Sequence, residues 1–494
     1  MKIHPFLFSA VILLSSILWI LPSSCSENPV VYVAFWFDTE DYILPQADDA
    51  AKRLAEMFAE RNVQATFKIV GEKARVLEER GRDDVILALA KNDIAYHATN
   101  HSIHPTPAEY SRDLDWHEGV REFIRREGIG LKTLQQVFGV NASCYGQAGG
   151  SWTPQSYAAL HKFQIPLYLD ATPHVNLDDR PFWFCGILTI LELGDCVMRT
   201  GWTNDEVKQA CAEFDRVHQK LTREGGGIIS IYYHPCEFIH EEFWDGVNFS
   251  RGANPPRSEW KLPPMKSSQE QEQAFNAFET YLDHIVKHPG VQLVTAREIP
   301  SLYPDRAYTR PITQNDIRTI ARTFQDQLSY IDLGDRILSA GEGLYALSQF
   351  VAKSKNGSHP AEVSLKFAYG PASQPLRIAS EGSFRWEAIQ QAAQDLVDAV
   401  DDAEQLPSAA WVDGRPWRLE DFAKTLAYAV ADESYSGDIT MQQGELRTMD
   451  YVADNAPDLW GWVIFPEGFD APRMMEIAKR QAWTIKPARL RLSN

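Results

Sequence analysis

The sequence is short of cysteine, of positive charge and of long apolar runs. Its six cysteines follow no zinc-knuckle spacing, and spacing alone does not give their pairing. Lys and Arg number 48 against 67 Asp and Glu, and the resulting formal net charge of −19 argues against nucleic acid as a main partner. Hydrophobic residues make up 44% of the chain, so we expect a sizeable core and exclude wholesale disorder.

The one long apolar run lies near the N-terminus. Lys2 precedes the apolar stretch Phe6–Leu21, and Pro-Ser-Ser-Cys-Ser follows it, which is typical of a secretory signal over residues 1–27. The run is short for the alternative, a transmembrane anchor. Cys25 is a candidate lipidated cysteine, so 1–27 is a signal peptide or a lipoprotein signal. We expect an exported protein of the periplasm, outer envelope or extracellular space, with membrane association only through a lipid anchor at Cys25.

Strand-like and helix-like segments alternate from residue 28 to residue 303. This alternation indicates βα units with a parallel sheet, and its length favours a (β/α) barrel, closed or nearly closed, in the α/β class. The predicted strands are Val30–Phe37, Gln64–Val70, Asp93–Tyr96, Ser143–Gly146, Ile165–Asp170, Phe182–Glu192, Gly227–Tyr233 and Val291–Thr295. The predicted helices are Ala47–Glu60, Glu72–Ala90, Thr106–Val137, Pro154–Lys162, Asn204–Arg223 and Ser267–Lys287.

A linker over 304–312 leads into a C-terminal region, 313–494, of different character. Thr313 and Asp316 form a capping-box pattern that opens a helix. Apolar residues at helical spacing over Trp386–Val400 and Leu419–Val430 predict two further helices, and Glu362–Tyr369 alternates like a strand. We expect a mostly helical α+β domain. The segment around Leu406-Pro-Ser loosely resembles helical cell-wall-binding repeats.

The stretch Tyr96–Pro105, with the sequence YHATNHSIHP, is the strongest functional signal. His97, His101 and His104 stand at i, i+4 and i+7, which places them on one face if the stretch is helical. Imidazole is a common ligand of divalent transition metals. Single histidines are usually polar loop residues, but three within eight residues after a predicted strand favour a metal site.

Carboxylates and other polar residues follow the predicted strands where they end. Asp38, Glu40 and Asp41 come directly after the first strand, and packed together they would repel one another unless a cation lies among them. Gln147, Asp170 and His234 also stand at predicted strand ends. In a parallel barrel these ends face one mouth, where the chemistry resides. Two imidazoles and one carboxylate form the donor set of a catalytic zinc.

These motifs resemble a known family. FDTED resembles the first motif of NodB-type polysaccharide deacetylases (carbohydrate esterase family 4), HATNH the second, and YYHP the late motif with the catalytic histidine. The resemblance spans Val30–Tyr303 and is closest to the divergent branch of peptidoglycan deacetylases and allantoinase-like proteins. It implies that Asp38 is the catalytic base and His234 the general acid.

The resemblance also implies a divalent metal, zinc first, with cobalt or nickel as alternatives. His97 and His101 match the metal ligands. For the carboxylate ligand, Glu40 is the closer match and Asp41 the other candidate. His104 is not a usual ligand and is expected to contact substrate or support a ligand.

The third motif departs from the family pattern. The family has an arginine there that orients the base, whereas this chain has YGQAGGSW, with Gln147 at the corresponding strand end. Gln147, Trp152 and Asp170 are therefore expected to contact substrate rather than form that ion pair. The long aromatic loop Cys236–Pro264 is expected to pack on the barrel or cover its mouth, with Phe243, Trp244 and Trp260 placed to stack on sugars.

We expect a metal-dependent hydrolase that removes acetyl groups from N-acetylated sugars of a cell-envelope or extracellular glycan. Two alternatives remain open. One is hydrolysis of a non-sugar C–N bond, as in allantoinase-like proteins. The other is a catalytically inactive glycan-binding protein, which the loss of the arginine at Gln147 favours.

Overall fold

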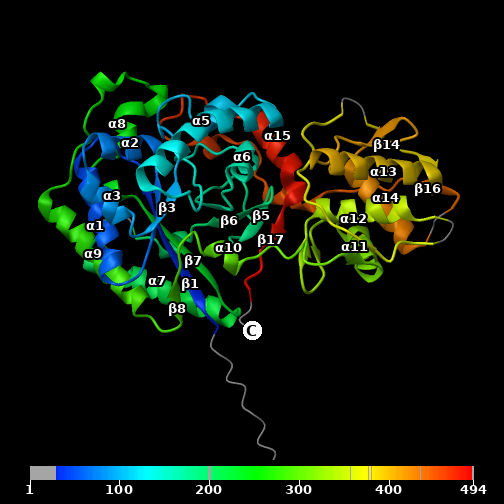
Figure 1. Cartoon of the computed structure of the whole chain (residues 1–494), viewed down its shortest axis with the longest axis horizontal. Helices are drawn as coiled ribbons and strands as arrows, with labels where there is room; N and C mark the ends of the chain where they lie inside the picture. The colour runs from blue at the N-terminus through cyan, green and yellow to red at the C-terminus, as the bar shows by residue number, and fades with distance from the viewer. Residues whose placement is uncertain are drawn as a thin grey trace, which may run out of the picture.

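The computed structural model describes residues 29–198, 202–355, 358–375, 378–379, 381–433 and 436–491 (Figure 1). The predicted export signal and Cys25 lie outside these residues, so both stay predictions. Among the residues in these ranges, no helix is both long enough and apolar enough to cross a membrane.

A parallel sheet around β1 (Val31–Thr39) forms the centre of the N-terminal part. β1 is an apolar run with nearly all of its residues buried, as a strand covered on both faces requires. It pairs in parallel with β7 (Gly227–Tyr233), with β2 (Thr66–Ile69) and, near its start, with β8 (Val291–Leu293). β3 (Asp93–Tyr96) pairs in parallel with β2. The carboxyl ends of these strands therefore lie at one edge of the sheet.

A second group of strands extends this sheet. β4 and β6 pair in parallel, and β5 and β17 add to them in antiparallel pairing. The single strand predicted over Phe182–Glu192 is in fact two, because Cys185 and Gly186 both have positive φ (48° and 73°) and turn the chain back. The strands of this group are β4 (Leu167–Asp170), β5 (Phe182–Phe184), β6 (Ile187–Leu191) and β17 (Lys486–Pro487).

Isolated contacts connect the two groups. Tyr145 forms one parallel bridge to Tyr96 of β3 and one to Tyr168 of β4, and backbone hydrogen bonds link the strand predicted around Tyr145 to both neighbours. After β6, Leu193 donates a backbone hydrogen bond to Ser230 of β7 (2.9 Å). The α/β class and the parallel sheet are thus as predicted, but among the residues that the structure describes the regular ladders do not run round a complete barrel.

Helices cover the sheet (Figure 1). The helix predicted over Glu72–Ala90 is broken by Gly81, whose φ of 64° is left-handed, and the one predicted over Thr106–Val137 is broken before Asp115, which caps a new helix. The helices are α1 (Gln46–Glu60), α2 (Gly71–Glu79), α3 (Asp83–Leu89), α4 (Pro107–Ser111), α5 (Trp116–Phe138), α6 (Gln155–Phe163), α7 (Asn204–Arg223), α8 (Trp244–Phe249), α9 (Ser268–Val286) and α10 (Ile299–Leu302).

The next part of the chain forms a second lobe, drawn in yellow and orange in Figure 1. The predicted helices are present, and Thr313 caps α11 through the expected capping box, but the strand predicted over Glu362–Tyr369 is only two residues long. The helices are α11 (Gln314–Asp326), α12 (Ala340–Lys353), α13 (Trp386–Ala403) and α14 (Leu419–Ala431). The short strands are β9 (Ile312–Thr313), β10 (Ile331–Asp332), β11 (Ile337–Leu338), β12 (Glu362–Val363), β13 (Ser383–Arg385), β14 (Ala410–Val412), β15 (Arg415–Trp417) and β16 (Asp438–Thr440).

The last part of the chain returns from this lobe to the first one. α15 (Pro472–Gln481) leads to β17, which pairs with β5, and Thr484 accepts a hydrogen bond from the Cys185 N–H (2.8 Å). The domain boundary predicted at residue 313 stays a prediction. Single-turn 3₁₀ helices are η1 (Gly194–Cys196), η2 (Pro235–Phe238), η3 (Ser250–Gly252), η4 (Arg257–Glu259), η5 (Arg447–Tyr451), η6 (Pro457–Trp460) and η7 (Ala482–Thr484).

Candidate active site

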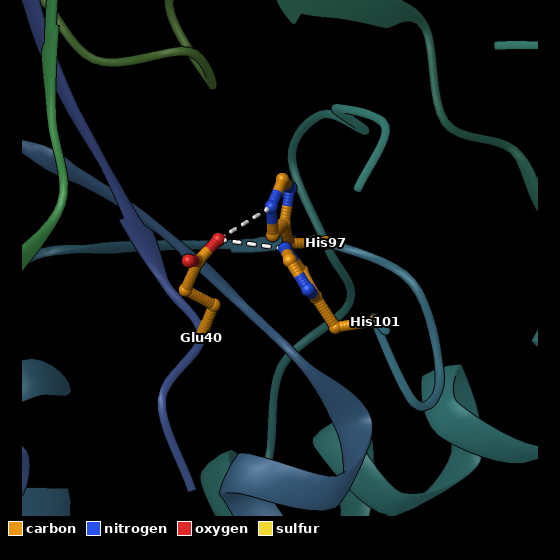
Figure 2. Close-up of side chains that lie close together, drawn as sticks. All are labelled: Glu40, His97 and His101. Atoms are coloured by element: carbon orange, nitrogen blue, oxygen red, sulfur yellow. Dashed lines mark ion pairs between the residues drawn. The ribbon is translucent and has the colours of Figure 1, made fainter. Parts of the chain in front are cut away.

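Three side chains meet at the edge where the parallel strands end (Figure 2). Glu40 follows β1 directly, His97 follows β3 directly, and His101 lies in the loop after β3. Glu40 Oε2 is 2.7 Å from His101 Nε2 and 3.4 Å from His97 Nε2. All three residues are buried. The structure therefore brings both predicted histidine ligands to one of the two candidate carboxylates.

The loop that carries the histidines is not helical, contrary to the spacing-based expectation. Ala98 and His101 have left-handed φ values of 65° and 55°, which an α-helix does not allow. The buried carboxylate of Glu127 holds this loop by accepting a hydrogen bond from the Thr99 N–H (2.7 Å). Because the chain reverses locally, His104 does not share a face with His97 and His101.

The donor chemistry of this cluster fits a divalent metal. His97 Nδ1 lies 3.1 Å from Gly146 O and His101 Nδ1 lies 2.6 Å from Ser102 Oγ, so a protein oxygen orients each ring through its other nitrogen. Within the described ranges, the two buried Nε2 atoms have no partner besides Glu40. One donor atom from each residue lies within 4.8 Å of the others. Three such ligands leave positions open for water and substrate.

Glu40 is held in place from the opposite side. Trp244 Nε1 donates to Glu40 Oε1 (2.9 Å), which leaves Oε2 toward the histidines. Burial alone would raise the pKa of Glu40, but His101 and His234 outweigh it and hold that pKa well below its usual range. Glu40 is therefore ionised at neutral pH and able to act as a ligand.

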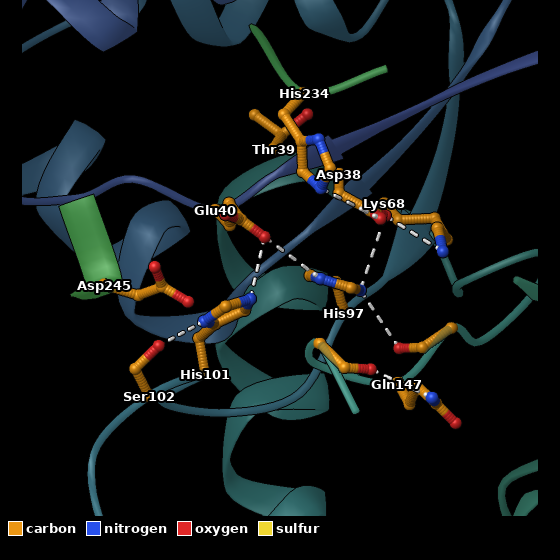
Figure 3. Close-up of polar contacts among 12 residues, drawn as sticks. Asp38, Thr39, Glu40, Lys68, His97, His101, Ser102, Gln147, His234 and Asp245 are labelled. Carbon is orange, nitrogen blue, oxygen red and sulfur yellow. Dashed lines mark hydrogen bonds and ion pairs between the residues drawn. The ribbon is translucent and has the colours of Figure 1, made fainter. Parts of the chain in front are cut away.

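A buried lysine lies between Asp38 and Asp170 (Figure 3 shows Lys68 beside Asp38). Lys68 Nζ is 2.9 Å from Asp38 Oδ1 and 3.0 Å from Asp170 Oδ2, and none of the three is more than 5% exposed. Burial opposes ionisation of Asp38, but His97 and Lys68 outweigh it and hold the pKa of Asp38 below its usual value. Burial raises the pKa of Asp170. Lys68 thus places a positive charge beside both carboxylates.

His234 stands across the site from the cluster. Its Nε2 atom is 3.8 Å from Asp38 Oδ2, and its Nδ1 atom is 3.2 Å from Glu237 Oε2. Burial lowers the pKa of His234, but Glu40 and Glu237 raise it to about 9. His234 therefore carries a proton at neutral pH and can donate it.

Asp41 does not join the metal cluster. Its Oδ1 atom accepts the backbone N–H groups of Ile43 (2.8 Å) and Leu44 (3.1 Å), and its Oδ2 atom is 3.0 Å from His240 Nε2. These contacts close the turn after β1 and direct the carboxylate toward His240 and away from His97 and His101. Of the two carboxylates left open by the sequence, Glu40 is the one at the cluster, and Asp41 is corrected to a role in the loop.

Two predicted substrate contacts also lie elsewhere. The His104 Nδ1 atom is within 2.8 Å of both carboxylate oxygens of Glu109, so the ring faces the start of α4. Trp152 is fully buried and stacks on His174, with the ring centroids 4.7 Å apart. Neither side chain lines the cavity described next, because local packing uses both.

A cavity of about 430 Å³ opens beside the cluster. Gln147 and Asp170, the predicted substrate contacts, line it together with Asp38, Glu40, His101 and His234. Gln147 is engaged by the hydroxyl of Tyr168 and donates to Gly149 O (2.9 Å), so it shapes the wall. Of the three aromatics predicted to stack on sugars, Phe243 lines the cavity, Trp244 is buried against Glu40, and Trp260 packs within its own loop.

Several residues of this site were missed by the sequence analysis. Lys68 carried a usable signal, since a lysine inside an apolar strand must find a buried partner. Asp245 and Trp462 carried none, because the short helix α8 and the irregular segment around Trp462 meet only in the folded chain; Trp462 Nε1 donates to Asp245 Oδ2 (2.9 Å). Both line the cavity.

Comparison of the sequence with family models and with curated proteins finds no match. Comparison of the structure finds the allantoinase PuuE at 13% identity and a TM-score of 0.39, over 56% of this chain and 93% of that one. It also finds a probable polysaccharide deacetylase from Pseudomonas aeruginosa at 13% identity and a TM-score of 0.38, over 56% and 93%.

A third similar structure is a carbohydrate esterase family 4 pseudoenzyme from Bacillus anthracis, at 12% identity and a TM-score of 0.30, over 55% of this chain and 65% of that one. The structural comparison thus finds polysaccharide deacetylases and an allantoinase, the proteins whose motifs the sequence resembles. These TM-scores are too low to place the chain within a family.

Proposed function

We propose that this protein is an exported, metal-dependent hydrolase that deacetylates N-acetylated sugars of a cell-envelope or extracellular glycan, on an incomplete (β/α) barrel. The proposal rests on one observation. Glu40, His97 and His101 lie together as a metal donor set, and Asp38 and His234 line the cavity beside them. The similarity to deacetylases agrees with this reading.

Each side chain of the site has its own part in the proposed reaction. Glu40, His97 and His101 would hold the divalent ion, zinc first, with cobalt or nickel as alternatives. When bound, such an ion polarises the amide carbonyl and activates water. Ionised Asp38 accepts the proton of the attacking water, and protonated His234 delivers a proton to the departing amine.

The function is tested by measuring acetate release. Purified protein reconstituted with zinc or cobalt is incubated with N-acetylglucosamine oligomers, and in parallel with a ureide. Acetate release confirms the deacetylase. Ureide hydrolysis without acetate release supports the non-sugar alternative, and stoichiometric metal with neither activity supports the binding protein.

Lys68 is proposed to position and tune Asp38 in place of the family's arginine. It comes from β2, packs on the Trp36 ring at 3.9 Å, and also donates to Leu169 O (2.9 Å), so its ammonium cannot move far. Gly146 leaves room for it, since a Cβ there would lie 1.9 Å from the lysine nitrogen.

Substituting Lys68→Met is expected to lower kcat by about 10- to 100-fold, the usual effect of removing an outer partner of a catalytic group. Without the ammonium, burial raises the pKa of Asp38. Because Asp38 acts only when ionised, the acid limb of the pH–rate profile should move to higher pH. Rates between pH 5 and 9 measure this shift.

The matched control is the double variant Lys68→Met with Asp170→Asn, which removes one buried charge of each sign. The double variant should have a larger free energy of unfolding than Lys68→Met alone, and the acid limb of its pH–rate profile should stay at the higher pH. An unshifted pH profile in both variants would show that Lys68 serves folding alone.

A further inference from the structure

The C-terminal segment 451–465, here called the strap, crosses the mouth of the cavity. At one end, Asn176 donates its N–H to Tyr451 O (3.0 Å), and the N–H of Ala453 donates to His174 O (3.0 Å). At the other end, the N–H groups of Arg251 and Gly252 donate to the carbonyls of residues 463 and 464 (3.0 and 2.8 Å). The strap is therefore fastened on both sides of the site by backbone hydrogen bonds.

Trp462 of the strap contacts one of the proposed metal ligands. Its indole lies perpendicular to the His101 ring, with centroids 5.4 Å apart, and its Nε1 atom donates to the buried carboxylate of Asp245 (2.9 Å). On the other side it presses on the Gly149–Gly150 backbone: a Cβ on Gly149 would lie 2.2 Å from the indole. Glycine at this position is required for the tryptophan to reach the site.

Residues of the strap form part of the cavity wall. Leu459, Trp462 and Val463 line the cavity together with the proposed acid–base groups Asp38 and His234. The cavity volume of about 430 Å³ lies toward the small end of pockets that surround a drug-sized ligand. A sugar inside a long polymer is linked to a neighbour on each side, and a wall beside the cluster would obstruct one of these neighbours.

We infer that the site accepts the N-acylated sugar at a chain end and excludes internal residues of a continuous polymer, with Trp462 as the residue that sets this specificity. This inference rests on the proposed function, because it concerns which sugar is deacetylated. It assigns the terminal N-acetylated sugar of a glycan chain as the substrate class.

Mass spectrometry of the products from N-acetylglucosamine pentamer tests the inference. We expect the wild-type protein to remove acetyl only from a terminal residue. Trp462→Ala opens the wall and should raise release from internal residues, relative to terminal release, by at least about tenfold. The control Trp411→Ala removes a half-exposed tryptophan of β14, far from the cavity, and should keep terminal selectivity.

A second measurement needs no variant. Per sugar, insoluble polymer should yield acetate at least about tenfold more slowly than the pentamer, because polymer has few ends. Release from internal residues by the wild-type protein, or a product pattern unchanged in Trp462→Ala, would overturn the inference and leave the deacetylase standing. Absence of acetate from every substrate would instead overturn the proposed function, and the inference with it.

Discussion

His101→Ala is expected to lose bound metal and to lower hydrolysis by more than about 100-fold, since even outer partners of metal ligands contribute 10- to 100-fold. The residue supplies one of three donors, and its Nε2 atom lies 2.7 Å from Glu40. His97→Ala should behave alike. Elemental analysis of purified protein gives the metal per chain, and acetate release gives the activity.

His284→Ala is the matched control for this pair. It removes a histidine from the surface of α9, where the ring pairs with Asp215 (2.6 Å), and should leave metal and activity unchanged. Full metal content in both His97→Ala and His101→Ala would contradict the proposed site, and retained acetate release without metal would contradict metal dependence.

Asp38→Asn is expected to lower acetate release by about 10²- to 10⁴-fold, the usual contribution of a general base, while metal content stays at one per chain. The amide keeps the size of the side chain but cannot accept the proton from water. Activity and metal are measured on the same preparation, so the two outcomes can be separated.

Asp41→Asn is the control for the neighbouring carboxylate. Asp41 contacts His240 and the backbone of its own turn, so its amide variant should retain both metal and most activity. Loss of metal in Asp41→Asn but not in Glu40→Gln would reverse the choice of ligand. Loss of metal in Asp38→Asn would make Asp38 a ligand rather than a base.

The positions of the reactive groups could be predicted because they depend on local pattern. A continuous apolar run such as β1 is a strand buried on both faces, and parallel strands place the residues that follow them at one edge. That argument correctly brought Asp38, His97 and His234 together. This prediction needed only the positions at which the strands end, and it did not depend on the conformation of any loop.

The orientation of side chains in loops could not be predicted. Helical spacing in the histidine loop was misleading because Ala98 and His101, neither of them glycine, adopt left-handed backbone. The choice between Glu40 and Asp41 depended on which carboxylate the turn after β1 uses for its own N–H groups. Such choices are made by contacts that a single sequence does not display.

Contacts between side chains that lie far apart in the sequence could not be predicted either. Lys68 and Asp170 are 102 positions apart, and Trp462 and Asp245 are 217 apart. No periodicity relates the members of either pair. Sequence reasoning found the strands that position the proposed site but not the lysine between Asp38 and Asp170, nor the wall of the cavity.

The strap also has a consequence for biosynthesis. Domains generally fold in the order in which they are made, N-terminal part first. Here Asp38 and the two histidines precede Trp462 and β17 by more than 350 positions. A nascent chain would therefore hold the residues of the proposed site long before the wall beside them exists, and the proposed selectivity would arise only after the strap has been made.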